Sequence, residues 1–184
     1  MIRAFLALEI PPALKRSLEE EERRLRSLLP RASWVRPDGL HLTLKFLGDS
    51  ESEVLAALAD ELRGAVAGRG TVRVTLHGSG FFPSPRRPRV AWLGGQAEGA
   101  LEVVEVVENV ALRHGFARDG RSWALHLTLA RLREPWPAPA VEAFLHWGES
   151  FTLAPFECPE LVLFQSTLRP DGAVYTALGR LALG

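Results

Sequence analysis

The tetrapeptide His-Leu-Thr-Leu occurs twice, at residues 41–44 and at residues 126–129, although the whole chain holds only 5 histidines. On a β-strand, side chains alternate between two faces, so each copy places its histidine and threonine on one face and its leucines on the other. Because an unperturbed imidazole has a pKa of about 6.5, one neutral and one protonated histidine can remove and deliver a proton in the same reaction. Threonine hydroxyls can donate hydrogen bonds to phosphate oxygens. Two such faces around one ligand suit acid–base chemistry at a phosphodiester.

Other interpretations of the two copies stay open. Each copy could be a core strand with an internally hydrogen-bonded histidine, although a second copy in a corresponding context weakens this interpretation. His41 and His126 could instead hold a metal ion, but zinc normally takes three or more protein ligands, and the motifs lack a nearby carboxylate or third histidine. We therefore predict no metal site. The remaining histidines lack the threonine partner and are interpreted as structural: His77, His114 and His146.

Two basic residues close to the motifs are candidates for contact with an anionic substrate. Lys45 shares the face of His41 and Thr43 under strict alternation, so it either neutralises phosphate charge or faces solvent at the strand end. Arg131 closes the second motif. Alternation puts it on the leucine face, opposite His126, and it reaches the histidine face only if the strand ends or bulges first.

Weaker candidates lie farther from the motifs. A basic loop could steer RNA or simply keep the surface soluble; its arginines are Arg86, Arg87 and Arg89. Three aromatic residues could stack on a base, but a core position is the more common role for such residues: Phe5, Trp34 and Phe82.

The composition describes a globular protein. The chain has 184 residues, 47% of them hydrophobic, with 22 Lys+Arg and 22 Asp+Glu. This balance argues against an extended nucleic-acid surface, so an anionic ligand must be held by a local cluster. Cys158 is the only cysteine, which excludes an internal disulfide. Without a long apolar run or a signal-peptide pattern, we expect a soluble, cytoplasmic protein with no membrane contact.

The apolar spacing predicts an α+β order of elements. Helices are expected at residues 13–29, from about 50–52 to 64–70, at 101–114 and at 141–147. The glutamates at residues 19–22 are expected on the solvated face of the first helix. Strands are expected at residues 1–10, 33–36, 41–46, 71–77, 90–93, 122–130, 151–153, 161–167 and 174–181, with loops at 78–89 and 134–140. Two similar halves, each supplying one histidine strand, form one domain over residues 1–184.

Several segments together resemble a known family. The sequences WVRPDGLHLTLKFLGD (residues 34–49), FFPSPRRPRVAWLG (81–94), LHLTLAR (125–131) and LFQSTLRPDGAVYTALG (163–179) resemble the bacterial and archaeal RNA 2′,3′-cyclic phosphodiesterases. These are also called 2′-5′ RNA ligases, within the two-histidine (2H) phosphoesterase superfamily. The opening RAFLALEIP fits as well, so the resemblance covers nearly the whole chain. One departure is Leu125, where the family often has proline before the second histidine.

The resemblance implies a bilobal fold, with two antiparallel sheets around a central cleft, helices outside and a pseudo-two-fold axis between the lobes. It implies a reaction without metal or cofactor, in which His41 is the proton donor and His126 the proton acceptor. Thr43, Thr128 and Arg131 would bind the phosphate.

The implied activity is hydrolysis of a 2′,3′-cyclic phosphate at an RNA end to a 2′-phosphate. The same site run backwards would join or cleave a 2′-5′ linkage, but water at about 55 M favours hydrolysis unless a structured RNA positions the hydroxyl. We expect a monomer acting on RNA ends, tRNA fragments among them. Two alternatives remain: an RNA-end-binding module without catalysis, and a phosphodiesterase for a small cyclic nucleotide.

Overall fold

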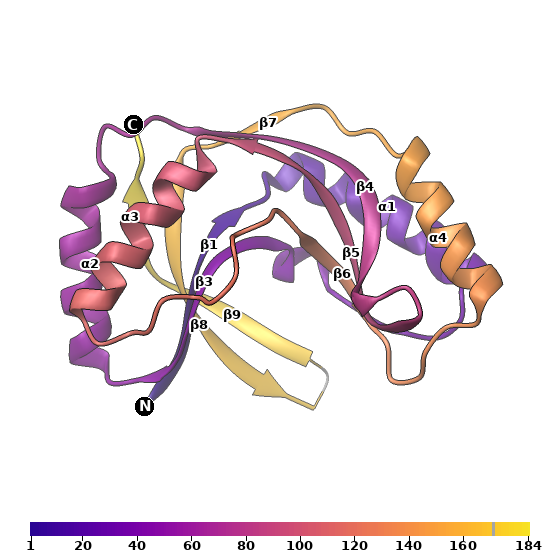
Figure 1. Cartoon of the computed structure of the whole chain (residues 1–184), viewed down its shortest axis with the longest axis horizontal. Coiled ribbons are helices and arrows are strands. Elements are labelled where there is room, and N and C mark those ends of the chain that lie inside the picture. The colour runs from indigo at the N-terminus through magenta and orange to yellow at the C-terminus, as the bar shows by residue number, and fades with distance from the viewer. Residues whose placement is uncertain (171) are drawn as a thin grey trace.

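The computed structural model describes residues 1–170 and 172–184. One sheet is antiparallel with the strand order β3-β1-β8-β9. Its strands are β1 (Ile2–Glu9), β3 (His41–Ser50), β8 (Glu160–Arg169) and β9 (Gly172–Ala182). Two helices lie on one side of it, α2 (Ser52–Val66) and α3 (Ala100–Arg113) (Figure 1). We call this the first sheet.

The second sheet has the order β2-β6-β5-β4-β7. Its strands are β2 (Ser33–Trp34), β4 (Val72–Ser84), β5 (Arg87–Glu98), β6 (Leu127–Arg131) and β7 (Phe156–Cys158). The helices α1 (Pro12–Leu28) and α4 (Ala138–Ser150) lie on its side of the molecule, and a 3₁₀ turn, Pro37–Gly39, leads into β3 (Figure 1). The predicted α+β fold, with two antiparallel sheets and outer helices, is confirmed.

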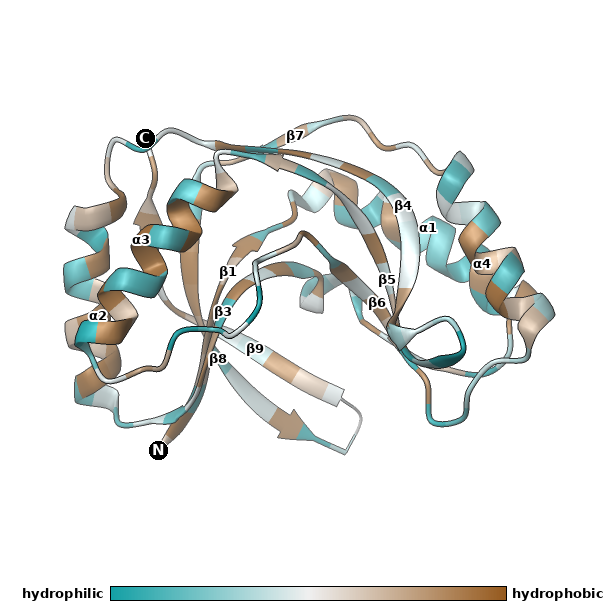
Figure 2. Ribbon diagram, in the orientation of Figure 1, coloured by the Kyte–Doolittle hydropathy of each residue, from teal (hydrophilic) through white to brown (hydrophobic). Residues whose placement is uncertain are grey.

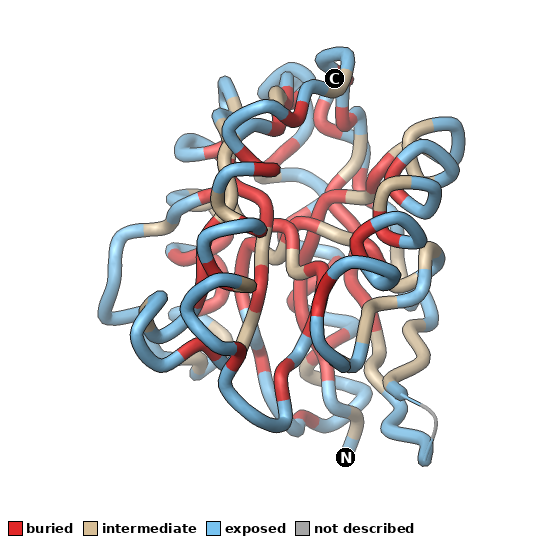
Figure 3. The backbone as a smooth tube through the Cα atoms, turned by 90° about the vertical axis from the view of Figure 1, so that its right-hand side faces the viewer, coloured by how far each residue is buried: buried red, intermediate tan, exposed pale blue. Residues whose placement is uncertain are grey.

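The core lies between each sheet and its helices. The helices carry hydrophobic residues on one side and hydrophilic residues on the other (Figure 2). Alternate strand residues such as Leu6, Leu8, Leu42 and Leu127 are fully buried, and buried positions run through the middle of the backbone trace (Figure 3). The leucines of both motifs thus anchor the strands, as alternation predicted. Among the described residues, no helix is long and apolar enough to cross a membrane.

Each histidine motif has a β-bulge at its last residue. The pairing of β1 with β3 shifts register between Leu6↔Lys45 and Ala7↔Thr43, which leaves Leu44 as the extra residue. The pairing of β5 with β6 shifts in the same way between Ala91↔Ala130 and Trp92↔Thr128, which leaves Leu129. A bulge lets two successive side chains share a face and reverses the alternation after them.

The first bulge overturns the placement expected for Lys45. Leu44 and Lys45 are both buried, whereas Phe46, which strict alternation would put on the face of Leu42 and Leu44, is 64% exposed. Lys45 therefore lies neither in solvent nor on the histidine face. The second bulge acts in the same way: Leu129 and Ala130 are buried, and the exposed Arg131 moves off the leucine face.

The loop prediction for residues 78–89 is wrong, because most of these residues belong to β4 and β5, which pair as a long hairpin. Gly78 takes the left-handed conformation (φ 71°) where the pairing shifts register, and this absorbs the irregularity. Pro83 and Pro88 pair with each other near the hairpin turn. Among the residues that the structure describes, neither proline pairs with a strand on its other side, because β7 pairs with β4 only at its far end and β6 pairs with β5 only from Val90.

Two smaller corrections concern strand boundaries. No strand forms at residues 151–153; β7 lies at Phe156–Cys158 instead and pairs with the start of β4. The strand expected at residues 122–130 begins only at Leu127, and His126 is the residue just before it.

Glu22 contradicts the expectation that all four glutamates of α1 face solvent. The buried positions of the helix are Leu18, Glu22 and Leu25, one stripe at helical spacing. Neither carboxyl oxygen of Glu22 has a hydrogen-bond partner in the described part of the chain, and the guanidinium of Arg26 is 3.6 Å from one of them. Burial raises the pKa of Glu22 to about 8, so the carboxyl is largely protonated at neutral pH.

Replacing Glu22 by methionine is expected to stabilise the protein, more at high pH than at low pH. Between the ordinary pKa of 4.5 and the folded value of about 8, the unfolded carboxyl is ionised while the folded one keeps its proton. Glu22 therefore costs stability progressively as pH rises through this window. Urea unfolding at about pH 5 and about pH 8 measures the difference, with exposed Glu20→Met as the control. An equal effect of Glu22→Met at both pH values would contradict the protonated state.

Candidate active site

His41 is the first residue of β3, and the 3₁₀ turn before it fixes its ring. Nδ1 lies 2.7 Å from the backbone oxygen of Gly39 and donates to it. This bond places the proton of the neutral ring on Nδ1. Among the described residues, Nε2 has no hydrogen-bond partner, so this nitrogen is available to a substrate.

His126 repeats the arrangement at the entrance to β6. Its Nδ1 lies 3.1 Å from the backbone oxygen of Ala124, again two residues earlier in the chain. Its Nε2 is likewise without a protein partner in the described part of the chain. Although His126 precedes its strand while His41 begins one, both rings are oriented by the same local hydrogen bond and offer the same nitrogen.

The two threonines occupy matching positions in the two sheets. Thr43 pairs with Ala7 on β1, and Thr128 pairs with Trp92 on β5. Both are half-buried, and neither hydroxyl bonds to another of the described residues. Each hydroxyl can therefore donate to a ligand on the face that its histidine shares.

Aromatic rings surround His41 more closely than the sequence suggested. Phe5 is buried, with its ring centroid 4.7 Å from that of His41, and Tyr175 meets the same imidazole edge-on at 4.9 Å. Phe5 therefore packs against the His41 ring inside the protein and is not available to stack on a base. Tyr175 of β9 received no role from the sequence, because nothing local links it to a residue so distant along the chain.

The other two aromatic candidates, Trp34 and Phe82, have different surroundings. Phe82 meets His126 edge-on, with ring centroids 5.2 Å apart, and is 41% exposed. Trp34 packs instead near Trp136 and beneath the guanidinium of Arg26. Phe82 is therefore the aromatic candidate that remains open to a ligand beside a motif histidine.

The pKa of His41 depends on charges that belong to the second motif. Desolvation by burial lowers the pKa of His41 to about 4. The positive charges of Lys15, His126 and Arg131 lower it further, while the hydrogen bond to Gly39 opposes the shift. His126 and Arg131 thus act on His41 from the second sheet, and Lys15 from α1. Arg131 was expected to leave the leucine face only if the strand ended or bulged before it, and the bulge at Leu129 meets this requirement.

In the free protein, the imidazole of His41 is expected to titrate near pH 4, below its ordinary 6.5, and a bound phosphate anion should raise this pKa. The anion favours the imidazolium and offsets the burial and the nearby cations that disfavour it. NMR titration of the His41 ring protons, with and without a nucleoside 2′-phosphate, measures both values. A pKa of about 6.5 in the free protein, or no change on binding, would contradict this electrostatic picture.

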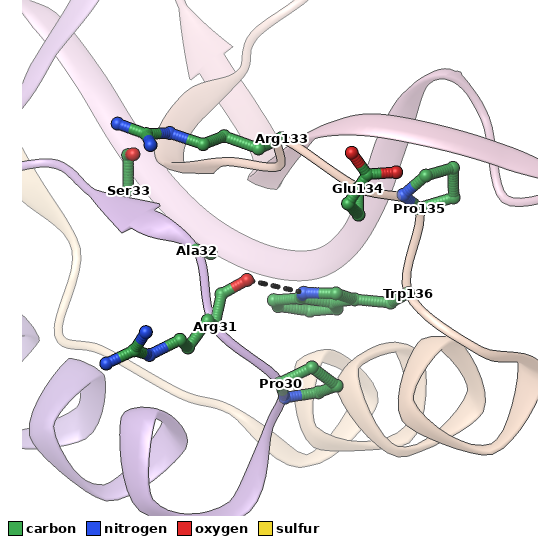
Figure 4. Close-up of a pocket in the computed structure, with 8 residues that line it drawn as sticks. All are labelled: Pro30, Arg31, Ala32, Ser33, Arg133, Glu134, Pro135 and Trp136. Carbon is green, nitrogen blue, oxygen red and sulfur yellow. Dashed lines mark hydrogen bonds between the residues drawn. The ribbon is translucent and has the colours of Figure 1, made fainter.

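The basic loop lies at the β4–β5 turn of the second sheet, and a cavity lies near it. Arg86 is in the β4–β5 turn, Arg87 is exposed, and Arg89 donates to the backbone oxygen of Arg133. A cavity of about 440 Å³ lies beside them, with Arg31, Arg133 and Trp136 in its wall (Figure 4). It contains neither histidine, so the candidate site is the shared face of the two motifs rather than this cavity.

Within residues 1–170 and 172–184, no three histidine, cysteine, aspartate or glutamate side chains gather to hold a metal ion. His77, His114 and His146 stand apart from the motif pair. His114 is 2.7 Å from Glu61, and His146 is 3.4 Å from Glu149.

The sequence is similar to known phosphoesterases. A family model for LigT-like phosphoesterases matches residues 8–92. An RNA 2′,3′-cyclic phosphodiesterase of Thermus thermophilus is 34% identical, over 99% of this chain and 90% of the relative. One of Archaeoglobus fulgidus is 30% identical over 96% and 98%, and one of Methanothermobacter thermautotrophicus 28% over 95% and 95%.

Solved structures agree with the fold. The protein TT0787 of Thermus thermophilus superposes with a TM-score of 0.78 at 26% identity, over 99% of this chain and 98% of that one. Escherichia coli LigT in complex with 3′-AMP gives a TM-score of 0.76 at 26% identity, with the same coverage.

Proposed function

Because this chain belongs to the RNA 2′,3′-cyclic phosphodiesterase family of LigT-like phosphoesterases, we propose that it hydrolyses 2′,3′-cyclic phosphate ends of RNA with His41 and His126 as its acid and base. The chain is a hydrolase of this class. The observation that supports the site is the matched pair: two imidazoles from different sheets, each oriented by a carbonyl two residues earlier, with the charge of one acting on the other.

The reaction needs one proton removed and one delivered. Neutral His126 accepts a proton from a water molecule through Nε2 while the water oxygen attacks phosphorus. The bond between phosphorus and the ribose 3′-oxygen breaks, and protonated His41 gives its proton to that oxygen. The product ends in a 2′-phosphate and a free 3′-hydroxyl. The two histidines finish with exchanged protonation states, which solvent resets.

The low pKa of His41 in the free protein fits this assignment only if the substrate supplies negative charge. The cyclic phosphodiester is an anion, and placing it beside His41 restores the imidazolium just when a proton donor is required. Proton delivery is thereby linked to substrate binding. The assignment of His41 as donor and His126 as acceptor comes from the family resemblance.

The remaining site residues hold the phosphate. Thr43 and Thr128 donate their hydroxyl hydrogens to the two non-bridging oxygens, on which negative charge grows in the transition state. Arg131, exposed and within electrostatic reach of His41, adds a fixed positive charge. Phe82, exposed beside His126, is placed to contact a base at the RNA end.

We propose that the physiological substrates are RNA ends, tRNA fragments among them, and that a cytoplasmic monomer acts on them. The same steps, with a ribose 5′-hydroxyl in place of water, would make a 2′-5′ linkage when a structured RNA holds the ends together.

The experiment is incubation of the purified protein with a 2′,3′-cyclic-phosphate oligonucleotide in excess EDTA, followed by identification of the terminal phosphate. The expected product carries a 2′-phosphate, and the rate is unchanged by the chelator. Binding of the oligonucleotide without any product would favour an RNA-end-binding module. Equal kcat/KM for the oligonucleotide and a 2′,3′-cyclic mononucleotide would favour an enzyme for small nucleotides.

A further inference from the structure

The segment that carries His126 has little structure of its own. Residues 116–126, between α3 and β6, contain neither helix nor strand. An imidazole at the end of such a segment can be held accurately only by contacts with the rest of the fold. The contacts that hold this one come from the strand of the other histidine.

We propose that Lys45 is a positioning residue: its buried ammonium ties the segment before His126 to β3 and so sets the spacing between the two imidazoles. This inference rests on the proposed function. Lys45 lies four residues after His41 on the same strand and is only 1% exposed.

The ammonium of Lys45 has a complete set of partners. Nζ is 2.8 and 2.9 Å from the two carboxyl oxygens of Glu108 on α3, and 2.9 Å from the backbone oxygen of Ala117. These bonds use all three N–H donors of the ammonium. Asp119 adds its carboxylate at 3.7 Å. Lys45 thus connects β3 to the helix before the segment and to two residues within it.

A second tie reinforces the first. The indole Nε1 of Trp123 donates to the backbone oxygen of Thr43 at 2.9 Å. Trp123 stands three residues before His126, and Thr43 lies two residues after His41. The segment is therefore fixed to β3 at both Lys45 and Thr43, next to the residues that do the chemistry.

The bulge at Leu44 is what makes this contact possible. Without it, Lys45 would share the face of His41 and Thr43. The corresponding residue of the second motif is Ala130, which is buried after its own bulge but has no side chain that could reach across. Only one of the two otherwise matching motifs carries the connection.

The buried ion pair of Lys45 and Glu108 is better suited to positioning the segment than to stabilising the fold. Removing two charges from water costs free energy, and a buried ion pair often stabilises a fold no better than apolar side chains of similar size. The directional bonds from the Lys45 ammonium to Glu108 and Ala117, in contrast, specify one geometry. An apolar replacement of both partners should therefore preserve the fold and lose the positioning.

The test is the double variant Lys45→Met/Glu108→Leu, which leaves no buried charge without its partner. We expect a melting temperature close to that of the wild type. We expect kcat on the cyclic-phosphate oligonucleotide to fall about tenfold to a hundredfold, because a displacement of about 1 Å can cost 10²-fold, with KM changed much less. Amide hydrogen exchange should become faster in residues 116–126 and stay unchanged in β1.

The matched control is Arg73→Gln/Glu157→Gln. It removes an exposed ion pair of 3.3 Å that joins β4 to β7 and touches neither motif, so it should leave kcat unchanged. Retention of kcat within about twofold by the Lys45/Glu108 variant would overturn the proposal. Faster exchange throughout both sheets would also overturn it, because the pair would then only support the fold.

Trp123→Phe keeps the test decisive if the double variant does not fold. It removes the indole N–H bond to Thr43 and keeps an aromatic ring at that position. We expect faster exchange in residues 116–126 and a lower kcat; unchanged values of both would overturn the proposal. Hydrogen exchange also separates the two hypotheses. If the wild type fails to hydrolyse the cyclic phosphate, the proposed function is wrong, while exchange in this segment still tests whether Lys45 holds it.

Discussion

Replacement of either His41 or His126 by alanine is expected to lower kcat on a 2′,3′-cyclic-phosphate oligonucleotide by at least about 10²-fold, the range of general acid–base catalysis. Each imidazole handles one of the two protons, and the structure offers each Nε2 without a competing partner among the described residues. The double variant should be scarcely slower than the worse single one, because the two groups act as a unit. The control is His146→Ala, whose exposed ring on α4 pairs with Glu149 and lies outside both motifs.

A substrate with a good leaving group can show which histidine is the acid. A phosphodiester that releases 4-nitrophenolate needs no proton on its leaving oxygen. On that substrate His41→Ala should regain most of its lost rate, whereas His126→Ala should stay slow because the water must still be deprotonated. The opposite pattern would exchange the two roles. Near wild-type turnover in either variant on the cyclic phosphate would end the paired acid–base account.

The second large effect is expected at the threonines. Thr43→Val and Thr128→Val should each lower kcat about tenfold to a hundredfold, because the change removes one hydroxyl donor and keeps the side chain's shape. Serine at the same positions should keep most of the activity. Steady-state kinetics of the four variants, with thermal unfolding to verify the fold, measures the effect.

Thr75→Val serves as the control for the threonine series. Thr75 is another half-buried strand threonine, paired with Gln96 in the second sheet, and it belongs to neither motif. Its replacement should leave kcat unchanged. If the valine variants at Thr43 and Thr128 behave like this control, the hydroxyls do not bind the phosphate oxygens.

Local alternation predicted part of the site and failed where the backbone departs from it. The leucines of both motifs are buried and the histidines and threonines are not, as a period of two requires. Bulges depend on the pairing with neighbouring strands, which the motif itself does not reveal. For this reason Lys45 was placed on the wrong face, and the position of Arg131 could be stated only as a condition.

Other differences arose from long-range packing. Glu22 falls on the buried stripe of α1 because of its helical spacing, although its charge suggested a solvated position. Tyr175 and Lys15 reach His41 from distant parts of the chain, so no local pattern could assign them to the site. The two motifs themselves suggested two polar faces around one ligand, and the family resemblance implied the central cleft between two lobes that would bring them together.

The most direct measurement is a crystal structure of the protein with a nucleoside 2′-phosphate, the product end of the reaction. The account predicts that Nε2 of His41 and Nε2 of His126 both lie within about 3 Å of oxygens bonded to the same phosphorus, with the threonine hydroxyls on the remaining oxygens. A phosphate held by one ring alone, with the other imidazole directed elsewhere, would contradict it.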